Sequence, residues 1–185
     1  MIHQLSVIRT DELELELELE PEVEPEVEPE VEPTPDHRHN KIIMSYYFAI
    51  LGSTNEPIYE LDIGTYRQNG DGSTNFPTEI NELKQFISNA SLDILENVQF
   101  KSNQIFFKNI DSFYGYSIDI FLTQGNTKFV ILTNCKNFDE NIRQFCIEIN
   151  EIYVKKILSP FYDLNTPIRS KVFDAKVRQL ARKYL

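Results

Sequence analysis

Residues 159–177 read SPFYDLNTPIRSKVFDAKV, and this stretch decides how the C-terminal part of the chain folds. Pro160 lacks a backbone N–H and cannot continue a helix, and Pro167 biases Thr166 toward an extended conformation. Both prolines also reduce the freedom of the unfolded chain, which makes an ordered turn less costly in entropy. The stretch therefore predicts that one helix ends here, that a rigid turn follows, and that another helix begins.

A short basic helix is predicted after this turn, and Ser170 is the side chain that can cap its N-terminus. The apolar positions of this helix are Val172, Phe173, Val177, Leu180 and Ala181. The turn has an apolar face that we expect to pack on the rest of the protein, formed by Phe161, Tyr162 and Ile168. The last helix should therefore fold back against the body of the protein.

Five strands and two longer helices are predicted upstream from hydrophobic periodicity and turn residues. The strands are residues 45–52, 57–63, 104–110, 116–123 and 127–133, and the helices begin near Thr78 and Phe138. With the last helix, the order is β-β-α-β-β-β-α-α. Antiparallel strands with helices between them indicate an α+β sandwich, in which one five-stranded sheet is covered by helices.

The first of these helices has a wide apolar stripe at helical spacing. Thr78 is its N-cap candidate, and Glu79 and Glu82 favour its first turn. The stripe that we expect to pack on the sheet is Ile80, Leu83, Ile87, Ala90, Ile94 and Val98, with Phe86 and Leu95 beside it.

Two residues in the second half of the predicted sheet have special positions. Gly125 lies in the tight turn between the last two strands, where a glycine can take a positive φ. Asp119 alternates with Ile118 and Ile120, so we expect its side chain to face outward or toward a partner.

The acidic charge of the chain is concentrated in residues 1–43. This segment holds 13 of the 29 acidic and 3 of the 18 basic side chains, a net of −10, whereas residues 44–185 hold 16 and 15, a net of −1. Residues 12–33 read ELELELELEPEVEPEVEPEVEP, and the recurring prolines exclude a lasting helix or strand ladder. We expect residues 1–43 to be a disordered acidic leader and residues 44–185 to be one domain.

The residues that many enzymes need are missing from the body of the protein. All three histidines, His3, His37 and His39, lie in the leader. Residues 44–185 therefore contain no imidazole for a Ser-His-Asp arrangement or a histidine zinc site. We expect no catalytic, cofactor or metal site.

Cys135 and Cys146 fit neither a CxxC motif nor paired metal spacing, and they indicate two reduced thiols of a cytosolic protein.

The targeting signals that would place the chain elsewhere are not recognised in the sequence. No run approaches the roughly 20 apolar residues of a membrane span. The N-terminus has no basic region followed by an apolar stretch.

Residues 166–185 carry six bases and one acid, a net of +5. This is consistent with a solvated helix face, or with a surface for a membrane or an acidic partner, while the poor aromatic interleaving argues against nucleic acid.

Four stretches together resemble the sedlin family, the small longin-like subunits of the transport protein particle (TRAPP) tethering complexes. They are FAILG at 48–52, EPIYELDI at 56–63, QFISNASLDILEN at 85–97 and PFYDLNTPIRSKVFDAKV at 160–177. The resemblance spans about residues 44–185 in order. Its most specific part is the last stretch, with Pro160, Phe161, Tyr162, Pro167, Ile168, Phe173 and Val177 as the structural motif.

This resemblance implies a longin (SNARE-like) fold and a non-catalytic adaptor role in ER-to-Golgi and Golgi vesicle transport. It implies a hetero-oligomer with other TRAPP subunits, peripheral association with ER–Golgi membranes through that complex, and only indirect contact with SNARE proteins or a Rab-type GTPase. We therefore expect a cytoplasmic protein that works by protein–protein interaction.

Asp93 is the single residue that we expect to bind a partner. It interrupts the apolar pair Leu92 and Ile94, which alone would be typical of a solvated helix face. A carboxylate covered by a partner needs hydrogen bonds from that partner. The resemblance favours this second reading.

A stand-alone longin regulatory domain that binds a SNARE helix or a small GTPase is the alternative from another class of protein. It is expected to be followed by a SNARE heptad segment, which residues 1–185 do not contain.

Overall fold

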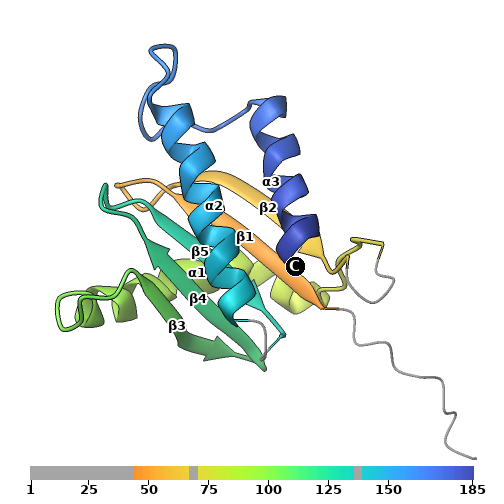
Figure 1. The fold of residues 1–185 in the computed structure, drawn as a ribbon. Coiled ribbons are helices and arrows are strands. Elements are labelled where there is room, and N and C mark those ends of the chain that lie inside the picture. The colour runs from red at the N-terminus through yellow and green to blue at the C-terminus, as the bar shows by residue number, and fades with distance from the viewer. Residues whose placement is uncertain (1–43, 67–70, 136–138) are drawn as a thin grey trace, which may run out of the picture. The chain divides into compact units, whose positions relative to one another are not determined.

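The computed structural model describes residues 44–66, 71–135 and 139–185, so the predictions for residues 1–43 lie outside the described residues. In this part, five strands form one antiparallel sheet in the order β2-β1-β5-β4-β3 (Figure 1). The strands are β1 (Ser45–Leu51), β2 (Pro57–Gly64), β3 (Phe106–Phe113), β4 (Tyr116–Leu122) and β5 (Lys128–Thr133). Helix α1 (Thr78–Val98) covers one face, and α2 (Asp139–Ile157) and α3 (Lys171–Tyr184) cover the other.

This arrangement confirms the predicted element order and the α+β class, and it is consistent with the longin-like fold. Strand β1 lies between β2 and β5 and is buried along its whole length. Because successive strand side chains point to opposite faces, β1 supplies two separate cores. Tyr46, Phe48 and Ile50 face α2, whereas Tyr47, Ala49 and Leu51 face α1.

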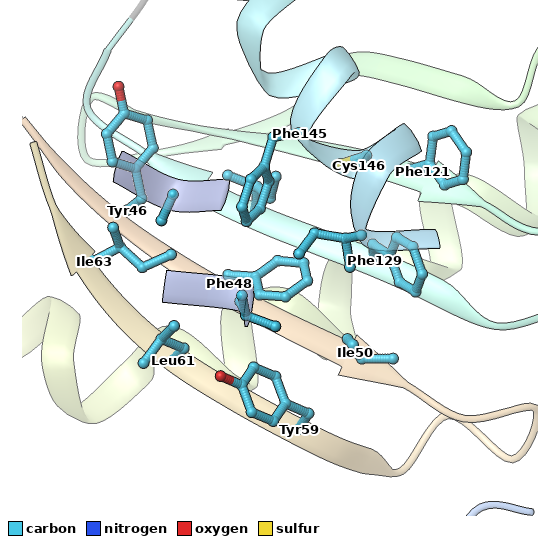
Figure 2. Close-up of a cluster of buried hydrophobic side chains, with 14 of the residues drawn as sticks. Tyr46, Phe48, Ile50, Tyr59, Leu61, Ile63, Phe121, Phe129, Phe145 and Cys146 are labelled. Carbon is cyan, nitrogen blue, oxygen red and sulfur yellow. The ribbon is translucent and has the colours of Figure 1, made fainter. Parts of the chain in front are cut away.

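The larger core lies between the sheet and the helices α2 and α3 (Figure 2). Phe48 is at its centre, with its ring centroid 5.2 Å from that of Phe145 and 6.1 Å from that of Phe129, both edge-on. Cys146 is buried in the same core and is a free thiol, as is Cys135. Aromatic pairs of this kind stabilise a core beyond the area that they bury.

Helix α3 is fixed to the body by its apolar face, as the sequence predicts, although Val172, which was expected on that face, is exposed. Its N-cap is Ser170, whose hydroxyl accepts a hydrogen bond from the Phe173 amide. Phe173 packs edge-on against Tyr59 of β2 at 5.2 Å, and Val177 is fully buried between α3 and the body. The Tyr59 hydroxyl donates to Asp174 at 2.8 Å, so both a polar and an apolar contact join α3 to β2.

Local turn chemistry differs from the predictions in two hairpins. Strand β3 begins and ends later than predicted, and a two-residue turn joins it to β4 through Tyr114 and Gly115, both at positive φ. Between β4 and β5 the residue at positive φ is Asn126, so the prediction for Gly125 is wrong. Asparagine adopts this conformation at a small cost, which lets it replace glycine there.

The two valines of α3 provide a matched test of this docking. We expect Val177→Asp to lower the free energy of unfolding by at least about 2 kcal/mol, because it buries an unpaired charge. Val172→Asp introduces the same charge at a position that is 66% exposed, so it should leave stability nearly unchanged. Denaturant unfolding followed by circular dichroism compares them, and equal midpoints for the two variants would contradict the buried docking of Val177.

Candidate partner-binding surface

The outward face of α1 carries exposed apolar side chains among polar ones, and it departs in part from the predicted stripe, of which Ile80, Ile87 and Leu95 are buried as expected. The residues that α1 buries are Ile80, Ile87, Ser88, Ser91, Leu92 and Leu95. Leu83, Phe86 and Ala90, which were expected to pack on the sheet, are exposed, and Phe86 is 69% exposed. The helix therefore presents large apolar side chains to its surroundings.

Two serines explain why this face points outward. Ser88 and Ser91 lie on the buried side, where their hydroxyls donate to the backbone carbonyls of Lys84 and Ile87 at 2.7 and 2.9 Å. Because these bonds satisfy the hydroxyls within the helix, small polar residues can pack on the sheet at little cost. The N-terminus also differs from the prediction, since Pro77 is the N-cap and Thr78 is already helical.

Polar contacts to β1 and β2 fix the orientation of α1. The Lys84 amine lies 2.6 Å from the Asp62 carboxylate and 5.0 Å from the centroid of the Tyr47 ring. The Gln85 amide donates to Glu60, which also accepts a hydrogen bond from the Tyr47 hydroxyl. Burial, followed by this bond to Glu60, raises the pKa of Tyr47. These contacts prevent the helix from rotating its apolar face toward the sheet.

Asp93 lies on this outward face, in helical register with Phe86 and Ala90. Its side chain is exposed. Among the described residues its carboxylate makes no hydrogen bond or ion pair, and only its backbone carbonyl is used, as the acceptor for Asn97 at 2.8 Å. The structure thus places a free carboxylate beside exposed apolar side chains, the composition of a surface that another protein can cover. We call Leu83, Phe86, Ala90 and Asp93 the α1 face.

The α2–α3 turn is held by polar contacts. The Tyr162 hydroxyl donates to the Thr166 carbonyl at 2.7 Å, and the Ile168 amide donates to Ile58 of β2 at 2.8 Å. Asn165, at a φ of 62°, accepts a hydrogen bond from the Ser53 amide at 3.0 Å.

The residues of the predicted structural motif differ in how deeply this turn buries them. Gly52 lies next to Asn165, and a Cβ at this position would lie 2.5 Å from the Asn165 side-chain oxygen and would displace it. Ile168 is buried as expected, and Tyr162 is half-buried; Pro160 and Pro167 are exposed. Phe161 is 96% exposed, so the prediction that it packs on the body is wrong.

A shallow groove of about 500 Å³ lies between the β4–β5 hairpin and the C-terminal half of α2. Apolar side chains from several elements line it, among them Ile105, Phe121, Val154 and Leu164. None of its lining residues is charged, so it favours an apolar rather than an ionic ligand. It is a second surface on which a protein segment could dock.

A buried carboxylate under α2 was missed by the sequence pattern. Asp119 is 3% exposed and faces the α2 side of the sheet, so the expectation that it faces outward is wrong. It accepts a hydrogen bond from the backbone N–H of Asn109 at 2.6 Å, where a register shift in β3 leaves this residue at a φ of 46°. Burial raises the pKa of Asp119 to about 6, and this bond opposes the shift.

The charged neighbours of Asp119 are Asp139 and Lys108. The neighbouring Asp139 forms an ion pair with Lys108, so the amine that could compensate Asp119 is already engaged. No group of three metal-ligating side chains occurs within the described ranges.

None of the helices in those ranges combines the length and the apolar character that a membrane span requires.

Comparisons with known proteins identify the family of this chain. A family model described as Sedlin matches residues 50–183. The transport protein particle 20 kDa subunit of Schizosaccharomyces pombe is 42% identical over 142 residues, which cover 77% of this chain and 100% of the relative. A trafficking protein particle complex subunit 20 of Saccharomyces cerevisiae is 33% identical, covering 77% and 99%. A probable trafficking protein particle complex subunit 2 of Drosophila melanogaster is 34% identical, covering 76% and 97%.

Asp119 gives a prediction for pH dependence. Because its pKa is higher in the folded state than the ordinary 3.8, its ionisation destabilises the fold above about pH 6. We expect Asp119→Asn to raise the free energy of unfolding at pH 7.5 by up to about 3 kcal/mol, with the gain shrinking as the pH falls toward 4. Denaturation curves across this range provide the measurement, and Asp163→Asn on the exposed turn is the control. A gain that does not depend on pH would contradict the assignment.

Proposed function

Since this chain belongs to the sedlin family, we propose that it is a non-catalytic adaptor subunit of a TRAPP vesicle-tethering complex. The relatives named as transport or trafficking protein particle subunits support this, because they match over almost their whole length. The proposed role is to link the core of the complex to other subunits in ER-to-Golgi and Golgi vesicle transport. The protein would then be cytoplasmic and would reach ER–Golgi membranes peripherally, within the complex.

The observation that carries this proposal is the α1 face. Leu83 and Phe86 offer apolar area that a neighbouring subunit can bury, and Asp93 offers a carboxylate for its hydrogen-bond donors. If the neighbour covers Asp93 without donors, desolvation of the charge costs several kcal/mol. The pair of features therefore selects partners that combine an apolar patch with a donor at one position. It supplies specificity as well as affinity.

The described side chains agree with a role in assembly more than with one in catalysis. The body has no histidine, and the neighbouring carboxylates of Asp119 and Asp139 are engaged, the first by a backbone N–H and the second by Lys108. Activation of a Rab-type GTPase would in this proposal be the work of other subunits, with this chain contacting SNARE proteins or GTPases only indirectly.

The uncharged groove beside α2 favours a second candidate function. An amphipathic helix could place its apolar face between Ile105 and Val154, as peptide helices do in other grooves. In that case the protein would act as a longin-type regulatory domain for a SNARE helix or a small GTPase. The two candidates differ in whether the chain is found in a constitutive complex.

Purification from cytosol separates these candidates. With a C-terminal tag and moderate salt, we expect the chain to be recovered in a large assembly, whose members mass spectrometry identifies as other small longin-like subunits and larger tethering subunits. Recovery as a free monomer of about 20 kDa would refute the constitutive-subunit role, and it would direct attention to transient helix or GTPase partners of the groove.

Substitution of Asp93 tests the α1 face directly. We expect Asp93→Tyr to abolish recovery of the neighbouring subunit while the thermal unfolding curve stays that of the wild type, because an exposed side chain contributes little to stability. Phe86→Ser should weaken recovery in the same direction. Glu140→Tyr, on the exposed start of α2, replaces an acid by tyrosine elsewhere and is the matched control. Unchanged recovery of the neighbour by Asp93→Tyr would refute the role of this face.

A further inference from the structure

The end of the domain where α2 stops and α3 starts combines positive charge with exposed apolar side chains. The two helices run antiparallel, and the turn between them projects at this end (Figure 1). Lys155 and Lys156 lie in the last turn of α2, and Lys171 and Lys176 lie in the first half of α3. Lys155, Lys156 and Lys176 border a small hollow of about 150 Å³ between the helices. We call these four residues the lysine cluster.

The charge of this cluster is largely available for a ligand. Lys155, Lys171 and Lys176 make no hydrogen bond or ion pair with any of the described residues, and Lys156 rests over the ring of Tyr162 at 5.1 Å. The acid closest in sequence to Lys171 and Lys176, Asp174, is engaged instead by Arg178 at 2.9 Å and by Tyr59. Glu151 and Asp163 are the acids nearest in sequence to Lys155 and Lys156, and neither forms an ion pair with a described residue. The lysines therefore keep their attraction for an external anion.

Apolar side chains lie on the chain next to these lysines. Leu158, Phe161 and Leu164 project from the α2–α3 turn, and Val172 follows Lys171 on α3; all four are exposed. Phe161 belongs to an ordered turn, because Tyr162 and Asn165, which follow it in the chain, are held by hydrogen bonds. A side chain that is almost fully exposed contributes little to the stability of the isolated domain.

We propose that this end of the domain contacts an anionic membrane surface directly. The lysine cluster would attract lipid phosphates and carboxylates, while Phe161 and Leu158 would enter the boundary between head groups and acyl chains. Stable membrane attachment requires two signals of this kind, since neither a few bases nor a few apolar side chains are sufficient alone. The projecting turn favours a bilayer over an acidic protein, because Phe161 and Leu158, which are 96% and 75% exposed, protrude from the surface.

This contact goes beyond the proposed function. An adaptor that associates with membranes through its complex requires no lipid contact of its own. A direct contact adds a constraint on orientation, because the end that carries the α2–α3 turn must then face the bilayer. The acidic residues 1–43 oppose binding of the full chain to anionic lipid, so any binding that is observed must come from a local basic surface.

The lack of tryptophan in the chain allows a direct test in the full-length protein. A Phe161→Trp variant carries a single tryptophan at the proposed contact, and Tyr114→Trp places one on the exposed β3–β4 turn. With vesicles of phosphatidylcholine containing about one third phosphatidylserine, the emission of Phe161→Trp should shift to the blue, and salt should reverse the shift. Phosphatidylcholine vesicles alone should give no shift, and Tyr114→Trp should respond to neither.

Removal of charge gives a second, quantitative test. Lys171→Ala with Lys176→Ala, made in the Phe161→Trp protein, should raise the lipid concentration for half-maximal shift about fivefold per lysine. Lys101→Ala with Arg143→Ala removes the same charge from other parts of the domain. This control should change the lipid concentration for half-maximal shift little. The proposal would be overturned if anionic vesicles caused no shift, or if both tryptophans shifted equally. It would also be overturned if the two double variants had the same lipid concentration for half-maximal shift. A response to polyglutamate but not to vesicles would overturn it in favour of an acidic protein partner.

Discussion

The structure depends on the burial of β1 on both sides. Its seven residues are all buried, and they alternate between a core under α2 and α3 and a core under α1. A strand in this position cannot carry an unpaired polar side chain on either face, because both faces are dry. The other elements follow from this constraint, since β2 and β5 must satisfy its backbone groups and a helix must cover each of its faces.

Helix α1 covers its face of the sheet with a mixture of apolar residues and serines, and this choice creates the candidate functional surface. Because Ser88 and Ser91 satisfy their hydroxyls within the helix, the buried side needs fewer large apolar residues. Phe86 and Leu83 are thereby left on the outside, where they contribute little to folding. The same distribution places Asp93 on this outward side, about two helical turns after Phe86. Stability and recognition are thus assigned to opposite sides of one helix.

Much of the fold could be predicted from the sequence, because strands β1, β2, β4 and β5 have strong periodicity, and because Ser170 and the two prolines define the last helix by local chemistry. The buried face of α1 could be predicted only in part, since Ile80, Ile87 and Leu95 are buried as expected but Leu83 and Ala90 of the same predicted stripe are exposed. Tertiary contacts, such as Lys84 with Asp62, decide which side of the helix packs on the sheet. Burial of Asp119 was equally hidden, because it depends on a register shift in a neighbouring strand.

The candidate surfaces lie on different sides of the sheet, and this separation bears on how the protein could work. The α1 face covers one side, whereas α2, α3 and the turn between them cover the other (Figure 1). A partner on α1 therefore does not compete sterically with a ligand at the lysine cluster. The polar contacts that order the α2–α3 turn, Asn165 with Ser53 and Tyr162 with Thr166, hold Phe161 away from the core. If both surfaces were used together, the rigid sheet between them would fix the orientation of a bound subunit relative to the membrane.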